Sequence, residues 1–139
     1  MLFDSRKKPE TLTPKQVLGE RGEEAAAHYL RRQGYKILVR RFRSKSGEID
    51  IVCRHKDWLV FVEVKTRKGE QFGVPSDAVN ARKQRHISKV ALDYLRLLNY
   101  PPLRFRFDIV EVVMRLEADK PDDIRLYQNA FDLSEPYIY

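Results

Sequence analysis

GEIDIVCRHKDWLVFVEVKTR, residues 47–67, contains two runs rich in Val, Ile and Phe, at 48–54 and 58–66. Runs of this composition, separated by a few residues, predict two β-strands joined by a hairpin turn. Side chains alternate along a strand, so Glu63 and Lys65 share one face of the second strand while valines take the other. A strand this apolar is normally buried on both faces, and its two ionisable groups therefore need a partner.

A tight turn at residues 55–58 would set the register of this hairpin. Asp50 would then lie directly opposite Glu63, with the two Cβ atoms about 4.5–5.5 Å apart. The same register would place Glu48 opposite Lys65. Two carboxylates that close repel each other unless a cation lies between them, and one or two carboxylates completed by water and phosphate suit Mg²⁺. The hairpin therefore predicts a divalent-metal site for phosphodiester hydrolysis, in which Lys65 positions or deprotonates the attacking water.

The alternative is that Glu48 with Lys65, and Asp50 with a nearby arginine, form cross-strand ion pairs on a solvated face. A further carboxylate that converges on the same site argues against this alternative. Glu23 borders the apolar stripe of a predicted helix, which the carboxylate pair is expected to face, whereas Glu24 points away from that stripe. Taken alone, Glu23 would more simply be a surface glutamate near a helix N-terminus.

The flanking sequence predicts two helices and further strands. Apolar residues at helical spacing predict helices over residues 14–33 and 81–99, and Gly19 and Gly22 would let the first helix approach its neighbours closely. A flexible tail is expected at 1–13, a loop at 67–79, and strands at Lys36–Arg43, Arg104–Arg115 and near Ile124–Gln128. The order αβββαββ predicts a single α/β domain over residues 14–139, a mixed sheet flanked by helices.

The chain is basic, since 27 Lys and Arg residues against 20 Asp and Glu residues give a net charge of +7. Such an excess favours polyanionic partners, because cations that neutralise phosphates release condensed counterions. The alternative is that the charge keeps a small protein soluble. Two dense basic regions, before the hairpin and at the start of the second helix, could follow a phosphate backbone or be solvated. The candidate nucleic-acid-binding residues are Arg41, Arg43, Arg82, Lys83, Gln84 and Arg85.

Composition excludes several classes of protein. No apolar run approaches the roughly 20 residues that span a bilayer, and the first residues do not resemble a secretory signal, so we expect a cytoplasmic protein. Cys53 is the only cysteine, which rules out an internal disulfide and a multi-cysteine zinc site. The histidines show no metal-ligand spacing. Asp108, in an apolar run, could support the site or be a buried ion-pair partner.

Asp50 followed by Glu63-Val64-Lys65 resembles the motif of the PD-(D/E)xK nuclease superfamily, with Ile49 where the name-giving proline would stand. More closely, the chain resembles the YraN-like family of small, uncharacterised bacterial proteins, which is distantly similar to archaeal Holliday-junction resolvases. The resemblance covers about residues 16–131 and rests on the segments GERGEEAAAHYL, GEIDIV, FVEVKTR, the Lys83-containing helix start, RFDIVEV and NAF.

The resemblance implies a restriction-endonuclease-like core of αβββαβ order. Asp50 and Glu63 would hold Mg²⁺ or Mn²⁺, with Glu23 as a helical acid that completes the metal shell, and Lys65 would be the catalytic lysine. The implied substrate is DNA, branched or damaged, and junction nucleases suggest a homodimer by analogy. A DNA-binding module without turnover is the first rival, and a basic RNA- or ribosome-associated protein, which lacks a recognisable RNA motif, is the second.

Overall fold

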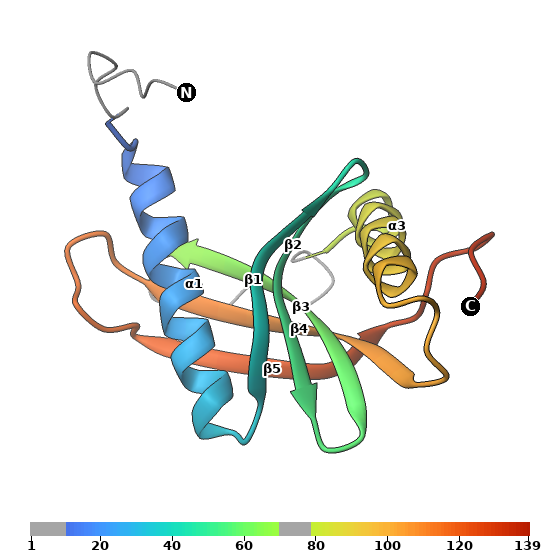
Figure 1. Cartoon of the computed structure of the whole chain (residues 1–139). Helices are drawn as coiled ribbons and strands as arrows, with labels where there is room; N and C mark the ends of the chain where they lie inside the picture. The colour runs from blue at the N-terminus through green and yellow to red at the C-terminus, as the bar shows by residue number, and fades with distance from the viewer. Residues whose placement is uncertain (1–10, 70–78) are drawn as a thin grey trace, which may run out of the picture.

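The computed structural model describes residues 11–69 and 79–139, where a five-stranded sheet carries one helix on each face (Figure 1). The α/β class and the predicted order αβββαββ are confirmed for this part of the chain. The remainder of the predicted tail and loop lies outside the described residues. No helix in the described ranges is both long and apolar enough to cross a membrane. The elements are α1 (Pro14–Arg32), β1 (Lys36–Ser44), β2 (Gly47–His55), β3 (Trp58–Lys68), α3 (Ala81–Leu97), β4 (Arg104–Met114) and β5 (Asp123–Phe131).

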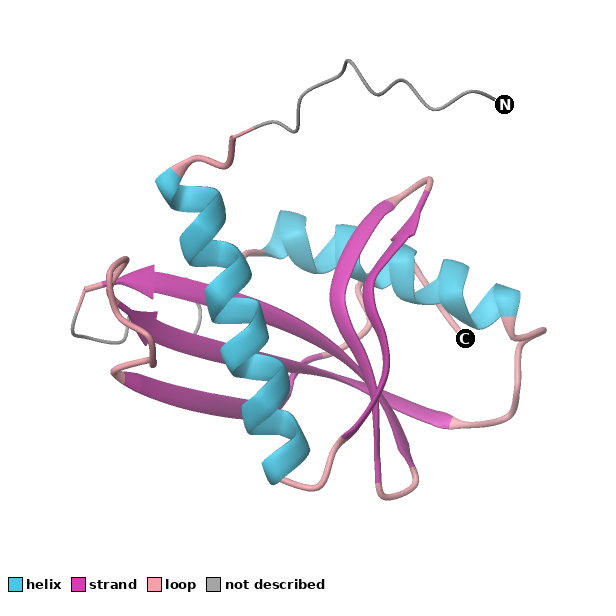
Figure 2. Ribbon diagram, turned by 60° about the vertical axis from the view of Figure 1, so that its left-hand side comes forward, coloured by secondary structure: helices cyan, strands magenta, loops and turns pink. Residues whose placement is uncertain are grey.

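The sheet is mixed, with the strand order β1-β2-β3-β4-β5. β3 and β4 are parallel, while the three other neighbouring pairs are antiparallel. Parallel pairing requires a crossover connection, and α3 lies on that crossover. The β1–β2 hairpin extends past the other strands, and its tip lies beside α3 (Figure 2). There Ser44 donates a hydrogen bond to the Asp93 carboxylate at 2.6 Å.

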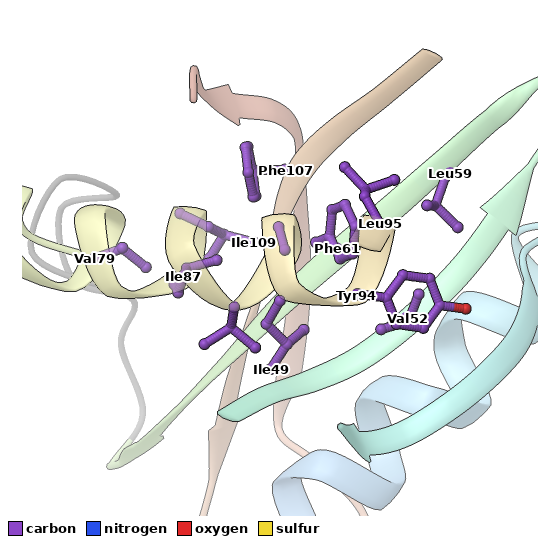
Figure 3. Close-up of a cluster of buried hydrophobic side chains, with 12 residues drawn as sticks. Ile49, Val52, Leu59, Phe61, Val79, Ile87, Tyr94, Leu95, Phe107 and Ile109 are labelled. Carbon is purple, nitrogen blue, oxygen red and sulfur yellow. The ribbon is translucent and has the colours of Figure 1, made fainter. Parts of the chain in front are cut away.

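Strand β3 is buried on both faces, as its apolar sequence predicts. On one face Val60 and Val62 belong to a cluster with residues of α1. On the other face Phe61 packs against Tyr94 and Leu95 of α3 (Figure 3). Burying each large apolar side chain stabilises the fold by about 1.5–3 kcal/mol, so the two helices hold the central strand from both sides.

The register of β2 and β3 is the predicted one. His55 pairs with Trp58 across a two-residue turn, and the pairing continues in step as far as Ile51 and Val62. Lys56, in the turn, has a φ of 54°, the left-handed conformation that tight hairpin turns use. The turn therefore forms without the Asn-Gly or Asp-Gly sequence that most favours it.

Three details of the predicted elements are wrong. β3 continues to Lys68, into the predicted loop, because its parallel partner β4 runs beside it as far as Met114. In α1 both Ala26 and Ala27 are fully buried, whereas Ala25, which the apolar spacing places on the buried stripe, is half-buried. Leu98, which the apolar spacing of the second predicted helix includes in the core, is exposed, because α3 ends at the preceding residue.

Gly22 determines how closely α1 lies on the sheet. A Cβ atom built at this position would lie 1.9 Å from the Thr66 Oγ1 atom of β3. Gly19 is exposed, and a Cβ atom there would have nothing within 4 Å. Of the two glycines expected to permit a close approach, only Gly22 does so.

The two glycines should therefore respond differently to alanine. Gly22→Ala should lower the free energy of unfolding by about 2 kcal/mol, because α1 or Thr66 must move to make room. Gly19→Ala should raise it by about 0.5–1 kcal/mol, because alanine has the higher helix propensity. Urea unfolding curves of the two variants check this, and a shift of the same sign in both would contradict it.

Candidate functional site

A groove opens between the first half of α1 and the β1–β2 hairpin, and mostly polar side chains line it. β3 contributes Lys65 and Thr66, and α3 contributes Lys83. The groove therefore brings residues from the first helix, the hairpin, the central strand and the second helix to one place. Its other ionisable lining residues are Lys15, Glu20, Glu23, Arg41, Arg43, Glu48 and Asp50.

Asp50 and Glu63 form a pair of neighbouring carboxyl groups, as the hairpin register predicts. The Asp50 carboxylate accepts a hydrogen bond from the Val64 backbone N–H at 2.8 Å and also hydrogen-bonds the Glu63 side chain. Glu63 is only 6% exposed. Burial, and then the negative charge of Glu63, raise the pKa of Asp50 well above its usual value. The pair therefore retains a proton at neutral pH.

Lys83 binds Glu63 from α3. The Asn80 side chain caps this helix and accepts a hydrogen bond from the Lys83 backbone N–H at 2.9 Å. The Lys83 ammonium forms an ion pair with the Glu63 carboxylate. Burial alone would lower the pKa of Lys83, but the charges of Glu63 and Asp50 outweigh burial and raise it. The expectation that the carboxylate pair faces the first helix is therefore wrong for Glu63, which meets α3.

Lys65 lines the groove together with Asp50. Within residues 11–69 and 79–139 its ammonium group takes part in no ion pair. Glu48, which would be the partner of Lys65 if the two formed a cross-strand ion pair, instead pairs with Arg43 across the β1–β2 ladder at 2.7 Å. The alternative of a Glu48–Lys65 ion pair is therefore wrong, and Lys65 is available to a molecule that enters the groove.

Glu23 reaches the groove from α1, but arginines of β1 hold its carboxylate. The side chain is buried, and its carboxylate accepts hydrogen bonds from Arg41 Nε at 3.2 Å and from Arg40 at 3.3 Å. In the described part of the chain, no three Asp, Glu, His or Cys side chains come close enough together to hold a metal ion. The structure thus brings Asp50 and Glu63 together, while Glu23 stays outside that pair.

The Asp50–Glu63 pair fits Mg²⁺ or Mn²⁺ as a two-carboxylate site. Mg²⁺ is commonly held by one or two carboxylates, with water and substrate phosphate filling its other positions. The neighbouring Asp50 and Glu63 carboxyl groups offer hard oxygen ligands, and a bound cation would offset the repulsion between their charges. A third protein carboxylate is not needed for such a site.

The candidate nucleic-acid-binding residues lie in different surroundings. Arg82 and Arg85 are exposed in the first turns of α3, where a phosphate backbone could reach them. Gln84 lies between them in sequence, and its side-chain amide donates a hydrogen bond to the Val79 carbonyl at 3.1 Å. Gln84 therefore stabilises the start of the helix. The remaining candidates, Arg41, Arg43 and Lys83, line the groove.

Asp108 belongs to a buried polar network that does not line the groove. Its carboxylate forms an ion pair with Arg106 at 3.0 Å and accepts a hydrogen bond from the Tyr35 hydroxyl at 2.8 Å. Burial is the main cause that raises the pKa of Tyr35 to about 12. The ring of Tyr35 also stacks on His55 with centroids 4.1 Å apart. Of the two roles expected for Asp108, the buried ion pair is confirmed.

Arg40 is the site residue that sequence reasoning missed. Strand alternation assigns Arg40 and Arg41 to opposite faces of β1, yet both side chains reach Glu23. The available signal was the spacing of three acids, Glu20, Glu23 and Glu24, on one face of a helix. Such a row of carboxylates needs a matching pair of cations nearby.

Comparison with known proteins identifies a family. A model of the uncharacterised protein family UPF0102 matches residues 22–112. A UPF0102 protein of Caldicellulosiruptor saccharolyticus is 44% identical over 117 residues, covering 84% of this chain and 98% of that protein. A UPF0102 protein of Symbiobacterium thermophilum is 47% identical, and the match covers 82% of this chain and 95% of that protein. A UPF0102 protein of Syntrophotalea carbinolica is 48% identical, and the match covers 84% of this chain and 92% of that protein.

The raised pKa of Asp50 predicts how stability without metal depends on pH. Its pKa rises from 3.8 when unfolded to about 8 when folded, so its stabilisation is complete below pH 4 and is lost as the pH rises through 8. Asp50→Asn removes this ionisation and should be more stable than the wild type by at least about 1 kcal/mol at pH 9. Below pH 4 the two should be nearly equal, and the difference should grow as the pH rises from 4 to 8.

Urea unfolding in EDTA at pH 3.5, 6 and 9 measures these differences. Asp57→Asn is the matched control, because the Asp57 side chain is 82% exposed in the β2–β3 turn. A wild type and an Asp50→Asn variant with parallel pH profiles would show that the two carboxyl groups do not compete for a proton.

Proposed function

The chain belongs to the uncharacterised protein family UPF0102, and we propose that this protein is a metal-dependent nuclease that hydrolyses phosphodiester bonds of DNA. The observation that carries the proposal is the carboxyl pair of half-buried Asp50 and buried Glu63, which adjoins a groove lined by Lys65 and other charged side chains. Perturbed carboxyl groups of this kind gather at functional sites, because stability alone does not favour them.

The order of the elements supports a restriction-endonuclease-like core. Asp50 lies on the second strand of an antiparallel run, and Glu63 and Lys65 lie on the third, as the PD-(D/E)xK motif would require. The resemblance to archaeal Holliday-junction resolvases makes branched DNA the first substrate to examine. A homodimer would present two such sites to one branched substrate.

Each polar residue of the groove would have a separate task in this reaction. Asp50 and Glu63 would hold one Mg²⁺ or Mn²⁺ between their carboxylates. When bound, the cation polarises a phosphoryl oxygen and lowers the pKa of water. Lys65 would orient the attacking water and assist its deprotonation. Lys83 would bind a phosphate oxygen of the substrate.

Glu23 would have the least direct part in metal binding. The resemblance assigns this helical acid to the metal shell. Because its carboxylate is engaged by two arginines, Glu23 would reach a cation only through a bridging water molecule.

A DNA-binding module without turnover is the second candidate function. The basic side chains of the groove and the exposed Arg82 and Arg85 support it as well as they support a nuclease. The carboxyl pair favours the nuclease, because a protein that only binds DNA gains nothing from acids that repel phosphates. Protein with intact binding and no cleavage under any metal condition would favour the second candidate.

Lys65 and Asp50 should differ when each is replaced by alanine. The wild type should cleave duplex, single-stranded or four-way-junction DNA with Mn²⁺ or Mg²⁺. Lys65→Ala should slow cleavage by about 100- to 10,000-fold and leave metal-dependent DNA binding largely intact, because it removes one proton-transfer group. Asp50→Ala should also lose the rise in melting temperature that the cation produces, because it removes a ligand.

Lys56→Ala is the matched control, because Lys56 is exposed in the β2–β3 turn. Without metal, the melting temperature of Lys65→Ala should stay near that of the wild type, since Lys65 has no ion pair among the described residues. A wild type that is inactive on every DNA, together with a large fall in the melting temperature of Lys65→Ala, would assign Lys65 a structural role.

DNA binding should depend steeply on salt, because the basic side chains displace counterions from phosphates. Reversing the charge at both Arg82 and Arg85 should weaken binding and lower the slope of log affinity against log salt by about two. Reversing Arg54 and Lys56, exposed near the β2–β3 turn, changes the net charge equally and should have a smaller effect. Fluorescence anisotropy measures both, and equal losses would show that only net charge matters.

A further inference from the structure

Arg40 and Arg41 both bind the Glu23 carboxylate, although they are neighbours in one strand. Arg41 Nε donates to both Glu23 oxygens, at 3.2 and 3.4 Å. Arg40 donates to Glu23 at 3.3 Å. Consecutive side chains of a regular strand point to opposite faces. A local departure from strand geometry is therefore needed to bring both guanidinium groups to Glu23.

That departure is at Arg41 itself. Its φ is 54°, in the left-handed region that favours glycine and is costly for a residue with a Cβ atom. Arginine has no intrinsic preference for this conformation, and strained residues persist only where the surrounding structure holds them. The contacts of Arg41 with the acids of α1 stabilise this backbone conformation.

Helix α1 presents a row of three acids to these two arginines. Glu23 contacts both arginines, Glu20 lies 3.7 Å from Arg41, and Glu24 binds Arg40 at 2.7 Å. Glu23 and Glu24 follow Glu20 by three and four residues, which puts both beside Glu20 on one side of the helix. The contact of Gly22 with Thr66 fixes the helix against β3, so the row of acids has a fixed place over the strand.

The outer part of the Arg41 guanidinium remains available to the groove. Only Nε donates a hydrogen bond within the described residues, and one terminal nitrogen, Nη2, makes the looser contact with Glu20 at 3.7 Å. The side chain is 43% exposed and lines the groove. The β1 residues before and after Arg41 pair with the β2 residues that flank Asp50, so Arg41 lies across the β1–β2 ladder from Asp50. A planar guanidinium in that position matches a phosphate group bidentately.

We propose that Arg41 is the residue that binds a backbone phosphate of DNA beside the Asp50–Glu63 pair, and that Glu23 is its positioning residue. Glu23 then acts through Arg41 rather than as a direct metal ligand. The inference rests on the proposed nuclease function and assigns a separate role to the helical acid. The strain at Arg41 is maintained because it aims the guanidinium into the groove.

The sign of one mutational effect tests the inference. Removing an acid near a bound polyanion ordinarily strengthens binding. If Glu23 positions Arg41, E23Q should instead weaken binding of a fluorescent DNA duplex by about 10-fold and lower its salt slope by about one, as R41Q does. The double variant should bind no more weakly than R41Q alone, because both changes remove the same contact. Anisotropy in EDTA measures affinity without cleavage.

Two further measurements separate Glu23 from its alternatives. E24Q is the matched control, because it removes an acid from the same helix turn whose partner is Arg40, and it should bind DNA at least as tightly as the wild type. The rise in melting temperature that Mn²⁺ produces should persist in E23Q and disappear in D50N. R41K keeps the charge without the planar fork and should show affinity between those of the wild type and R41Q.

The inference is overturned if E23Q strengthens DNA binding as E24Q does, or if it loses the Mn²⁺ effect as D50N does. Either result leaves cleavage by the wild type, and with it the proposed function, intact. A wild type that binds no DNA at low salt would overturn both.

Discussion

Strand β3 constrains the rest of the structure, because it is buried on both faces and paired along both edges. A charged group on such a strand can be satisfied only by neighbouring elements, since water does not reach it. Glu63 is the last fully buried residue of β3, and Asp50 from β2 and Lys83 from α3 surround it. The groove begins where this two-sided burial ends, at the half-buried residues 64–67.

From this strand outward, charges of alternating sign connect the elements. Lys83 of α3 meets the carboxyl pair of β2 and β3, and Arg41 of β1 lies across the ladder from Asp50 and binds Glu23 of α1. No single ion pair in such a chain contributes much to stability at an exposed site. Together they determine where each ionisable group points, which matters more for a site that handles phosphate than for the fold.

The sequence was sufficient for the hairpin register, because the parity of Glu63 and the length of the turn allow one answer. The spacing of apolar residues along the sequence was likewise sufficient to predict the order of the helices and strands. The partners of the acids were not predictable. Whether Glu63 meets Lys83 or Lys65 depends on how α3 lies on the sheet, and that placement follows from packing over the whole core. The binding of Glu23 by both Arg40 and Arg41 depends on a positive φ at Arg41, a conformation that arginine itself does not favour.

The position of β1 at the edge of the sheet has a consequence for association. An edge strand offers unpaired N–H and C=O groups to any other strand and is a common starting point for aggregation. β1 carries Lys36, Arg40, Arg41 and Arg43, and the left-handed residue interrupts its pleat. Like charges on two copies repel, so strand-to-strand pairing through β1 is disfavoured. The arginines that serve the groove thereby also protect the exposed edge of the sheet from continuing into a neighbouring molecule.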